Sequence, residues 1–281
     1  MNLFIFFLGR HPKFVRQLRS LKHYRKLINF DKPINLYEYI GKSAVFYDKR
    51  WCVLTDKYEV KKEVKKLIGE EYVNELYGVY DNADEIVVED LPQSFVLKTT
   101  NGCGTNIIVK DKQQVDWKEI KTKLNKWLVI PYGAMTGQPH YSQIRPRIIA
   151  EKLMMQKGKN GLTDYKFYCV NGKPVYVLVC ENRKVNSHLF EIGAFDMNWN
   201  PLPSFLSEGM PHAGEIQKPD SFDEMKGAVA KLAEDFKFVR IDFYNIDERP
   251  IFGEYTFTPN IIDLLSDKCS EDLFHKLMRG E

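Results

Sequence analysis

The 281-residue sequence is 44% hydrophobic and 13% aromatic, enough to bury a sizeable core shared by two or three subdomains. Its five cysteines are scattered without a CxxC pair, and its six histidines show no HExxH spacing. These patterns disfavour a disulfide framework and a zinc or histidine-based metal site, and they fit a reducing cytoplasm. The net charge of +3 is uneven, because residues 1–30 hold seven Lys or Arg and no Asp or Glu, leaving −4 for the remainder. We expect no nucleic-acid partner from such a distribution.

The first 30 residues form a basic segment with an apolar start. Residues 3–8, LFIFFL, are too few to span a bilayer, and positive charges follow them instead of preceding them as in a signal peptide. A buried first strand is one interpretation of this run. Pro12 is expected to open a helix with apolar residues at helical spacing, namely Phe14, Val15, Leu18, Leu21, Leu27 and Ile28. The segment is then either a helix packed on the body with a solvated basic face or a peripheral contact with an anionic membrane.

Residues 55–69, TDKYEVKKEVKKLIG, predict a helix capped by Thr55 or Asp56 and ended by Gly69. Its apolar stripe consists of Val60, Val64, Leu67 and Ile68. Most of its lysines are expected on a solvated face. Lys57 differs because it lies in the first turn, where a loop can aim it at a ligand.

A strand, a glycine loop and a second strand follow. Residues 94–98, SFVLK, and 106–110, NIIVK, predict the strands, and TTNGCGTN joins them. Gly102 and Gly104 allow the loop backbone to approach a triphosphate closely. The loop is not a P-loop, since GxxxxGK followed by Ser or Thr is absent. An ordinary Asn-Gly hairpin turn is the alternative, and Lys98 at the strand end favours the phosphate-binding interpretation.

The middle of the chain predicts a series of mixed elements. In order they are a helix at 116–128, a turn-rich aromatic loop at 131–146, a strand at 147–155, a hairpin of 164–170 and 174–180, a loop at 201–217, and helices at 221–236 and 272–278. Glu151 and Lys152 interrupt the apolar run of the strand. Ser221 is expected to cap its helix, with Glu224 at the capping-box position.

A second hairpin carries paired carboxylates. Residues 236–244 and 251–257 predict strands joined by a polar turn at 245–250. A tight return would bring Asp242 near Glu254, with Arg240 on the same face. Two crowded carboxylates repel unless something positive lies between them. Oxygen-only ligation with few carboxylates suits a Mg²⁺ that takes further ligands from water and phosphates. A surface hairpin with solvated charges is the alternative.

Taken in order, these segments resemble the ATP-grasp superfamily of ligases over residues 31–262. The resemblance rests on an Asp-Lys pair, a lysine before a glycine loop, a Glu-Lys hinge, and RxD followed by a late glutamate. More narrowly, LPQSFVLKTTNGCGTNIIVKDK, RIIAEK, DYKFYCVNGKP and FVRIDFYN with FGEYTFTP resemble the TupA-like branch, associated with teichuronopeptide and other bacterial surface-polysaccharide synthesis. The resemblance implies an α+β ATP-grasp fold, in which two α+β subdomains with antiparallel sheets clasp ATP, plus an N-terminal helical region. The expected division is a basic segment 1–30, a helical and substrate region 31–93, a lid subdomain 94–155 and a metal-binding subdomain 156–281.

The resemblance also implies a nucleotide site. Lys57 and Lys98 would neutralise phosphate charge beneath the loop of Gly102 and Gly104. Glu151 would accept a hydrogen bond from the adenine amino group. The hinge would be formed by the backbone of Lys152 and Leu153, and the ribose would be bound by Asp164.

Metal binding and catalysis are implied in the same way. Asp242, Glu254 and Thr256 would hold Mg²⁺ against the phosphates, although many superfamily members have Asn where this chain has Thr256. A hydroxyl is a weaker Mg²⁺ ligand than an amide carbonyl, so Asn260 is an alternative. Arg240, together with Lys98, would act in catalysis by steadying the transferred phosphoryl group and an oxyanion.

The expected function is that of an ATP-dependent carboxylate–amine ligase forming an amide through an acylphosphate. Its partners would be a glycan or glycan precursor with a carboxylate and an amine or amino acid, in the cytoplasm or at the inner membrane face. An ATP-dependent kinase with a single acceptor is one alternative. A non-catalytic scaffold of glycan biosynthesis is another.

Overall fold

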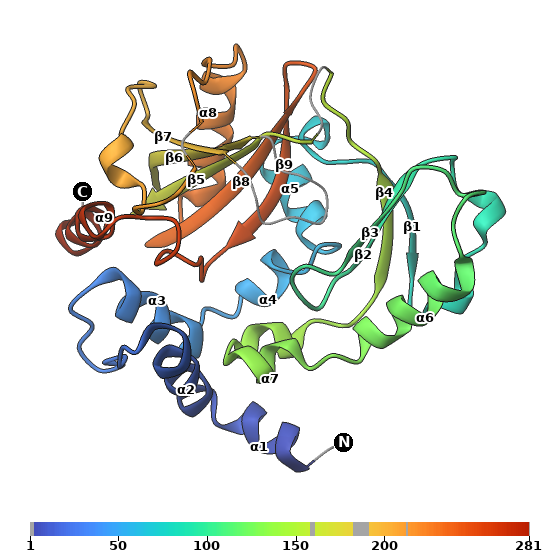
Figure 1. Ribbon diagram of the computed structural model, residues 1–281, viewed down its shortest axis with the longest axis horizontal. Coiled ribbons are helices and arrows are strands. Elements are labelled where there is room, and N and C mark those ends of the chain that lie inside the picture. Colours follow the sequence, from blue (N-terminus) through green and yellow to red (C-terminus); the bar gives the residue numbers. More distant parts are fainter. Residues whose placement is uncertain (1–2, 158–160, 182–190, 212, 281) are drawn as a thin grey trace. The chain divides into compact units, whose positions relative to one another are not determined.

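Two antiparallel sheets with flanking helices define the architecture of the protein (Figure 1). The computed structural model describes residues 3–157, 161–181, 191–211 and 213–280. Unit 1 comprises Met1–Leu27, Ala44–Glu63 and Asn74–Leu153, and unit 2 comprises Ile28–Ser43, Val64–Val73 and Met154–Glu281. The predicted α+β class is confirmed. The expected division into four consecutive segments stays a prediction, because units defined by packing need not coincide with functional regions.

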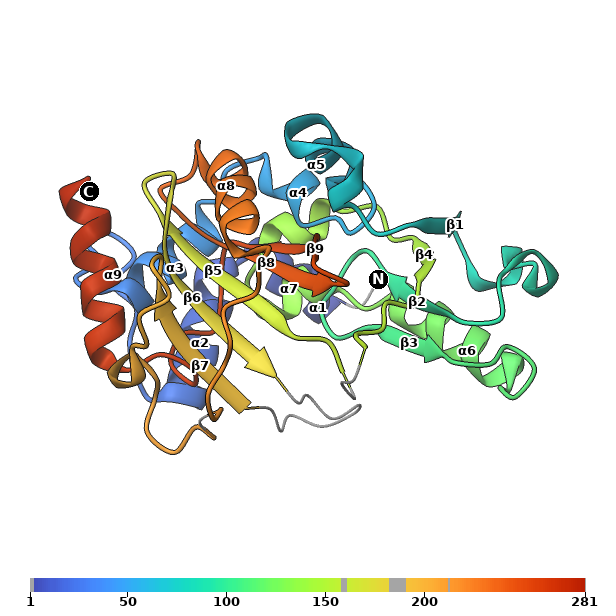
Figure 2. The ribbon, with the colours of Figure 1, turned by 90° about the horizontal axis from the view of Figure 1, so that it is seen from above.

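The sheet of unit 1 has the strand order β1-β4-β2-β3. Its strands are β1 (Leu76–Tyr80), β2 (Phe95–Thr99), β3 (Asn106–Val109) and β4 (Ile148–Lys152). Helix α6 (Trp117–Leu128) runs alongside β2 and β3 (Figure 2) and buries Ile120 and Leu124 against Phe95 and Leu97. Asp116 caps α6 by accepting from the backbone N–H groups of the second and third helical residues. These strands and this helix lie where the sequence predicts them, except that the sequence analysis does not predict β1.

The N-terminal part of unit 1 is mostly helical in its described residues. Helices α1 (Leu3–Arg10) and α2 (Pro12–Tyr24) follow one another, so the buried first strand considered for residues 3–8 is wrong. No residue of α1 is buried, and residues 3–8 do not pair with a strand of either sheet. Pro12 opens α2 as predicted, but Arg25 takes a left-handed φ of 52° and ends the helix before Leu27.

Residues 131–146, predicted as a turn-rich loop, contain a short helix and a 3-10 turn. These are α7 (Tyr132–Thr136) and η4 (Pro139–Gln143), and α4 (Trp51–Leu54) lies against η4. The buried ring of His140 accounts for the regular structure of this segment, because its centroid lies 5.5 Å from that of Trp51 and 4.5 Å from that of Tyr141. Aromatic packing thus overrides the local turn signals.

The sheet of unit 2 has the strand order β7-β6-β5-β8-β9. Its strands are β5 (Asp164–Val170), β6 (Lys173–Glu181), β7 (Glu191–Asp196), β8 (Phe238–Ile246) and β9 (Arg249–Thr256). Both predicted hairpins are confirmed, and the Asn171-Gly172 turn has the paired positive φ values of 49° and 80° that such a turn needs. The sequence analysis does not predict β7. Residues 182–190, which precede it, lie outside the described residues.

Helices cover both faces of the unit 2 sheet (Figure 1). Helix α8 (Phe222–Ala233) packs on one face, where the Phe222 and Phe167 rings stack at 5.8 Å. Helices α3 (Leu36–Val45) and α9 (Asp267–Arg279) join the cluster around Tyr168 on the other face. Because side chains alternate along a strand, Asp164 and Lys166 point to the same face as Tyr168.

Two helix starts differ from their predictions. The helix predicted from residue 55 is α5 (Val60–Ile68), preceded by a turn in which the Asp56 carboxylate accepts from the N–H groups of Tyr58 and Glu59. Ser221 stands at the start of α8 but makes no capping bond, and its buried hydroxyl has no partner among the described residues. The predicted capping box is therefore wrong, and Glu224 instead accepts from the Tyr72 hydroxyl.

Four short 3-10 turns complete the description, namely η1 (Glu70–Tyr72), η2 (Ala83–Glu85), η3 (Val88–Asp90) and η5 (Pro203–Phe205). None of the helices in the described ranges combines the length and apolar character required to cross a lipid bilayer.

Candidate active site

A buried carboxylate in unit 1 holds two lysines. Glu151 on β4 lies opposite Val96 of β2, two residues before Lys98 on the same strand. The Lys98 Nζ lies 2.6 Å from Glu151 Oε2, and the Lys61 Nζ lies 2.6 Å from Oε1. Burial alone would raise the pKa of the Glu151 carboxyl, but the two ammonium charges outweigh it and hold the pKa below the ordinary range. The group thus stays ionised and fixes both lysines on one side of the sheet.

Lys61 is the member of this group that sequence reasoning missed. It was counted among the solvated lysines of α5, yet it is buried and also donates to the Asn74 carbonyl at 3.0 Å. In the helix predicted over residues 55–69, Lys57 precedes it by four residues, a spacing that puts two side chains on one face, and this spacing was the available signal.

The turn that carries Lys57 is braced by an arginine. Arg147 donates from Nη2 to Asp56 Oδ2 at 2.9 Å, and its Nη1 lies 2.9 Å from Glu59 Oε1. Its guanidinium also lies 4.5 Å from the centroid of the Tyr58 ring. Since Asp56 caps the same turn, this bidentate contact fixes the backbone on both sides of Lys57. Sequence reasoning did not single out Arg147.

The glycine loop has a closed base and contacts Lys57. Thr99 and Thr105 close the base through a backbone bond of 3.1 Å and a hydroxyl bond of 2.7 Å. The Lys57 Nζ donates to the carbonyl of Gly102. Gly104 has φ +73°, which a side chain would strain, whereas a Cβ at Gly102 would meet the Tyr132 ring at an ordinary 3.6 Å. Backbone conformation therefore requires glycine at 104 but not at 102.

The predicted hinge directly follows Glu151 at the end of β4. The Lys152 N–H donates to the Glu75 carbonyl at 3.0 Å, and its carbonyl accepts from the Asn74 side chain at 3.0 Å. The Lys152 side chain is exposed and lies 3.6 Å from the Glu75 carboxylate. Two main-chain groups of the predicted hinge are thus engaged within unit 1, and Leu153 follows them.

Unit 2 holds the second cluster, on neighbouring strands. In the register of β8 and β9, Asp242 lies opposite Glu254, as the hairpin predicted, and Arg240 lies opposite Thr256. The Arg240 Nε donates to Asp242 Oδ1 at 2.7 Å, and its Nη2 donates to Asp242 Oδ2 at 2.8 Å. The same Nη2 reaches Glu254 Oε1 at 2.9 Å and Thr256 Oγ1 at 3.0 Å. The positive group between the carboxylates is the Arg240 guanidinium.

Lys166 completes this cluster from β5. Its Nζ lies 2.8 Å from Asp242 Oδ2 and 3.4 Å from Asp164 Oδ2. Burial opposes the charge of Lys166, but the two aspartates raise its pKa above the ordinary value. Burial likewise opposes the charge of Asp242, but Arg240 and Lys166 hold its pKa below the ordinary value. Sequence reasoning missed Lys166, although its two-residue spacing from Asp164 placed both on one strand face.

The oxygen donors of this hairpin fit a Mg²⁺ that keeps several waters. Asp242, Glu254 and Thr256 offer two carboxylates and a hydroxyl, and Mg²⁺ in phosphate sites commonly uses one or two carboxylates. Within the described ranges no three His, Cys, Asp or Glu side chains gather into a metal-binding group. In this structure the proposed ligand oxygens contact Arg240 or Lys166, so a Mg²⁺ would share or displace these contacts and take its remaining ligands from water and phosphates. The Asn260 side chain is exposed and donates to Asp263 at 2.6 Å.

The two antiparallel sheets agree with the ATP-grasp fold that the sequence resemblance implied, and the comparison with protein families gives the branch. Residues 46–275 match the family described as TupA-like ATP-grasp. The match covers most of the sequence, and the chain belongs to this family. No significant match is found among curated proteins.

Solved structures of several ATP-grasp ligases are similar to this chain at low identity. D-alanine–D-alanine ligase from Bacillus anthracis is 14% identical, with a TM-score of 0.49 over 86% of this chain and 67% of that one. The ATP-grasp ligase PsnB complexed with a minimal precursor is 11% identical, with a TM-score of 0.44 over 81% of this chain and 60% of PsnB. L-amino acid ligase from Bacillus licheniformis is 12% identical, with a TM-score of 0.43 over 69% of this chain and 41% of that one. The chain thus spans well under the full length of these proteins.

Proposed function

We propose that the protein is an ATP-dependent carboxylate–amine ligase. Membership of the TupA-like ATP-grasp family is the observation that carries this proposal. In such a reaction a carboxylate oxygen attacks the γ-phosphorus of ATP, the bond to the bridging oxygen breaks, and ADP leaves. The amine nitrogen then attacks the acyl carbon and loses a proton, and phosphate departs with the electrons of the C–O bond. The product is an amide.

The cationic group of unit 1 suits a triphosphate. Lys57 and Lys98 would neutralise phosphate charge, and Glu151 would keep Lys98 in place through their ion pair. The loop of Gly102 and Gly104 would add backbone N–H donors. Glu151 would also accept from the adenine amino group. Because the Lys152 main-chain groups are already engaged, an adenine at this hinge would depend mainly on Leu153.

The cluster of unit 2 suits the reacting end of the substrates. When bound, Mg²⁺ would neutralise phosphate oxygens, with Asp242, Glu254 and Thr256 as its protein ligands. Arg240 would steady the transferred phosphoryl group and the oxyanion formed when the amine attacks. Its present contacts with both carboxylates hold the guanidinium at that place. Asp164 would accept hydrogen bonds from the ribose.

We further propose that the carboxylate belongs to a uronic acid of a bacterial surface polysaccharide or its precursor, and that the amine is an amino acid. The association of the TupA-like family with teichuronopeptide and related polymers supports this choice. The reaction would take place in the cytoplasm, where ATP and glycan precursors meet.

The test is release of ADP with uronic-acid oligosaccharides and amino acids, followed by mass spectrometry of the product. A ligase releases ADP at full rate only when carboxylate and amine are both present, and the product gains the mass of the amine less water. ADP release with a single acceptor, and a product heavier by a phosphoryl group, would identify a kinase instead. Absence of ADP release with every pair, despite ATP binding, would favour the scaffold.

A further inference from the structure

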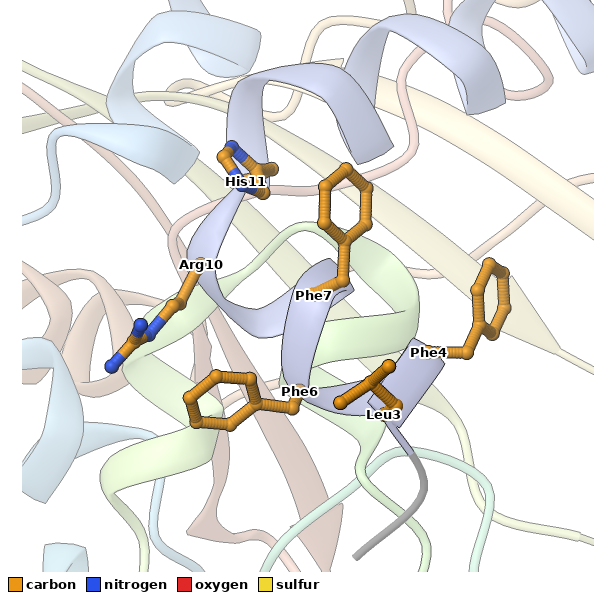
Figure 3. A pocket seen from close by; sticks show the side chains of 6 residues that line it. All are labelled: Leu3, Phe4, Phe6, Phe7, Arg10 and His11. Atoms are coloured by element: carbon orange, nitrogen blue, oxygen red, sulfur yellow. The ribbon is translucent and has the colours of Figure 1, made fainter.

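Helix α1 exposes almost all of its apolar surface. Leu3 and Phe4 are 84% and 65% exposed, and Phe6 and Phe7 are at least 40% exposed. Figure 3 shows these four side chains projecting from the helix around an open pocket of about 650 Å³, with Arg10 and His11 at its border. The helix is attached by its other side, since Gly9 lies against Ala134 of α7. Surface aromatics in this number need a partner that is itself apolar.

Helix α2 extends this surface. Phe14, Leu18 and Leu21 recur at the spacing of one helix face and are between 43% and 49% exposed. The Phe7 and Phe14 rings meet edge to face at 6.1 Å and join the stripe to α1. Only Val15 and Ser20 of α2 are buried. The sequence allowed either a helix packed on the body or a peripheral membrane contact. Packing on the body accounts for only a small part of the apolar side chains of α2.

Every charged side chain of helices α1 and α2 is basic. Residues 1–30 contain no acidic side chain, and six exposed cations border the apolar stripe, namely Arg10, Lys13, Arg19, Lys22, Arg25 and Lys26. The Arg10 guanidinium lies 4.2 Å from the Phe6 ring centroid, and the Lys13 Nζ lies 4.8 Å from that of Phe46, which is itself exposed. Cations and aromatics therefore alternate within one continuous surface, which we call the N-terminal face.

We propose that the N-terminal face docks on the surface of an anionic lipid bilayer. The aromatic and aliphatic side chains would enter the boundary between headgroups and acyl chains, while the cations pair with anionic headgroups. A second copy of the chain would bring like charges together. A nucleic acid would satisfy the cations but leave Leu3, Phe4 and Leu18 in water. An anionic bilayer satisfies both parts of the face.

The experiment is sedimentation of the full chain with vesicles of phosphatidylglycerol and phosphatidylcholine. We expect binding at low ionic strength, weaker binding at high ionic strength because salt screens the headgroup charge, and little binding to phosphatidylcholine alone. Arg19→Gln/Lys22→Gln should weaken binding on the order of thirtyfold, since each basic residue near such a surface changes the constant about fivefold. Phe4→Ser/Phe7→Ser should weaken it about tenfold or more, through lost apolar burial.

Lys118→Gln/Lys126→Gln is the matched control, because these α6 lysines are exposed and the charge change is the same. It should leave vesicle binding unchanged. Equal loss in the control, or no binding of the unmodified chain to anionic vesicles, would overturn the proposal. Circular dichroism and thermal unfolding establish that each variant is folded before it is scored.

Two further measurements test whether a second copy of the chain or a polyanion binds this face instead. Self-association in sedimentation velocity that Phe4→Ser/Phe7→Ser abolishes, without vesicle binding, would assign the face to a second copy. Oligonucleotide binding that depends on Arg19 and Lys22 but not on Phe4 and Phe7 would assign it to a polyanion. Either result would overturn the bilayer proposal, whereas vesicle binding that needs both the aromatics and the cations supports it.

Discussion

Each unit contains a cluster of paired carboxylates and cations, but the two units differ in which charge is in excess. In unit 1 one buried carboxylate, Glu151, holds two lysines. In unit 2 two cations, Arg240 and Lys166, are shared among the three carboxylates of Asp164, Asp242 and Glu254. Cations exceed carboxylates in the first cluster, and carboxylates exceed cations in the second. An excess of positive charge suits phosphates, and an excess of negative charge suits a divalent metal.

The comparison also shows how each cluster stays charged. Burial penalises the central ions, namely Glu151, Lys166, Arg240 and Asp242, and the opposite charge beside each one restores the charged form. Removing a central carboxylate should therefore destabilise the folded protein beyond the loss of that side chain, because the paired cations are left buried without an opposite charge. The following experiments test this balance, from the largest expected effect to the smallest.

Asp242→Asn should have the largest effect. The substitution removes a buried negative charge that pairs with both Arg240 and Lys166. We expect turnover to fall about a thousandfold or more, and the free energy of unfolding in urea to fall by about 3 kcal/mol. Asp247→Asn, the same chemical change in the exposed turn of the same hairpin, should alter neither. Near-normal turnover in Asp242→Asn would refute the metal assignment.

Lys98→Ala should remove most of the stabilisation that ATP and Mg²⁺ give to the protein. With the nucleotide at a hundredfold excess over its Kd, that stabilisation amounts to about 2.7 kcal/mol, measurable as a thermal shift. Lys110→Ala removes an exposed lysine beyond the end of the neighbouring strand and should retain the full shift. If the unmodified protein shows no shift at saturating nucleotide, the phosphate assignment of unit 1 fails.

Arg147→Lys should have an intermediate effect. Lysine keeps the charge but cannot bridge Asp56 and Glu59 bidentately, so the turn around Lys57 loosens. We expect the KM for ATP to rise about fivefold, equivalent to about 1 kcal/mol, with kcat changed less. Arg145→Lys, two residues away and exposed, is the control. A change confined to stability, with KM unaltered, would make Arg147 merely structural.

The pH dependence of stability should show the smallest effect. The folded pKa of Glu151 lies below its ordinary value of 4.5, so the unfolded chain binds more protons as the pH falls through this range. The stabilisation from Glu151 is complete above the unfolded pKa and is lost as the pH falls through the folded pKa. Glu151→Gln should therefore show a shallower decline of unfolding free energy in acid. An unchanged slope would mean that Glu151 is not held ionised.

Much of the fold follows from local sequence signals. The short polar turn and the alternation along the strands predict a hairpin that brings Asp242 near Glu254, and a one-residue bulge between Phe243 and Asp242 sets their final pairing. The Asn171-Gly172 turn is likewise visible in the sequence, because it acts on residues within a few positions. The glycine loop and Lys98 were recognisable for the same reason.

Tertiary structure alone decided which charges meet. Lys61 and Glu151 are ninety positions apart, and Lys166 and Asp242 are seventy-six apart, so only strand and helix packing brings each pair together. Helix α8 lacks the capping bond predicted from Ser221, and aromatic packing orders the segment around His140. Tertiary packing also left Phe4 and Phe7 exposed, where composition alone allowed a buried strand. Local signals specify turns and periods, whereas burial and long-range pairing depend on what the rest of the chain places alongside.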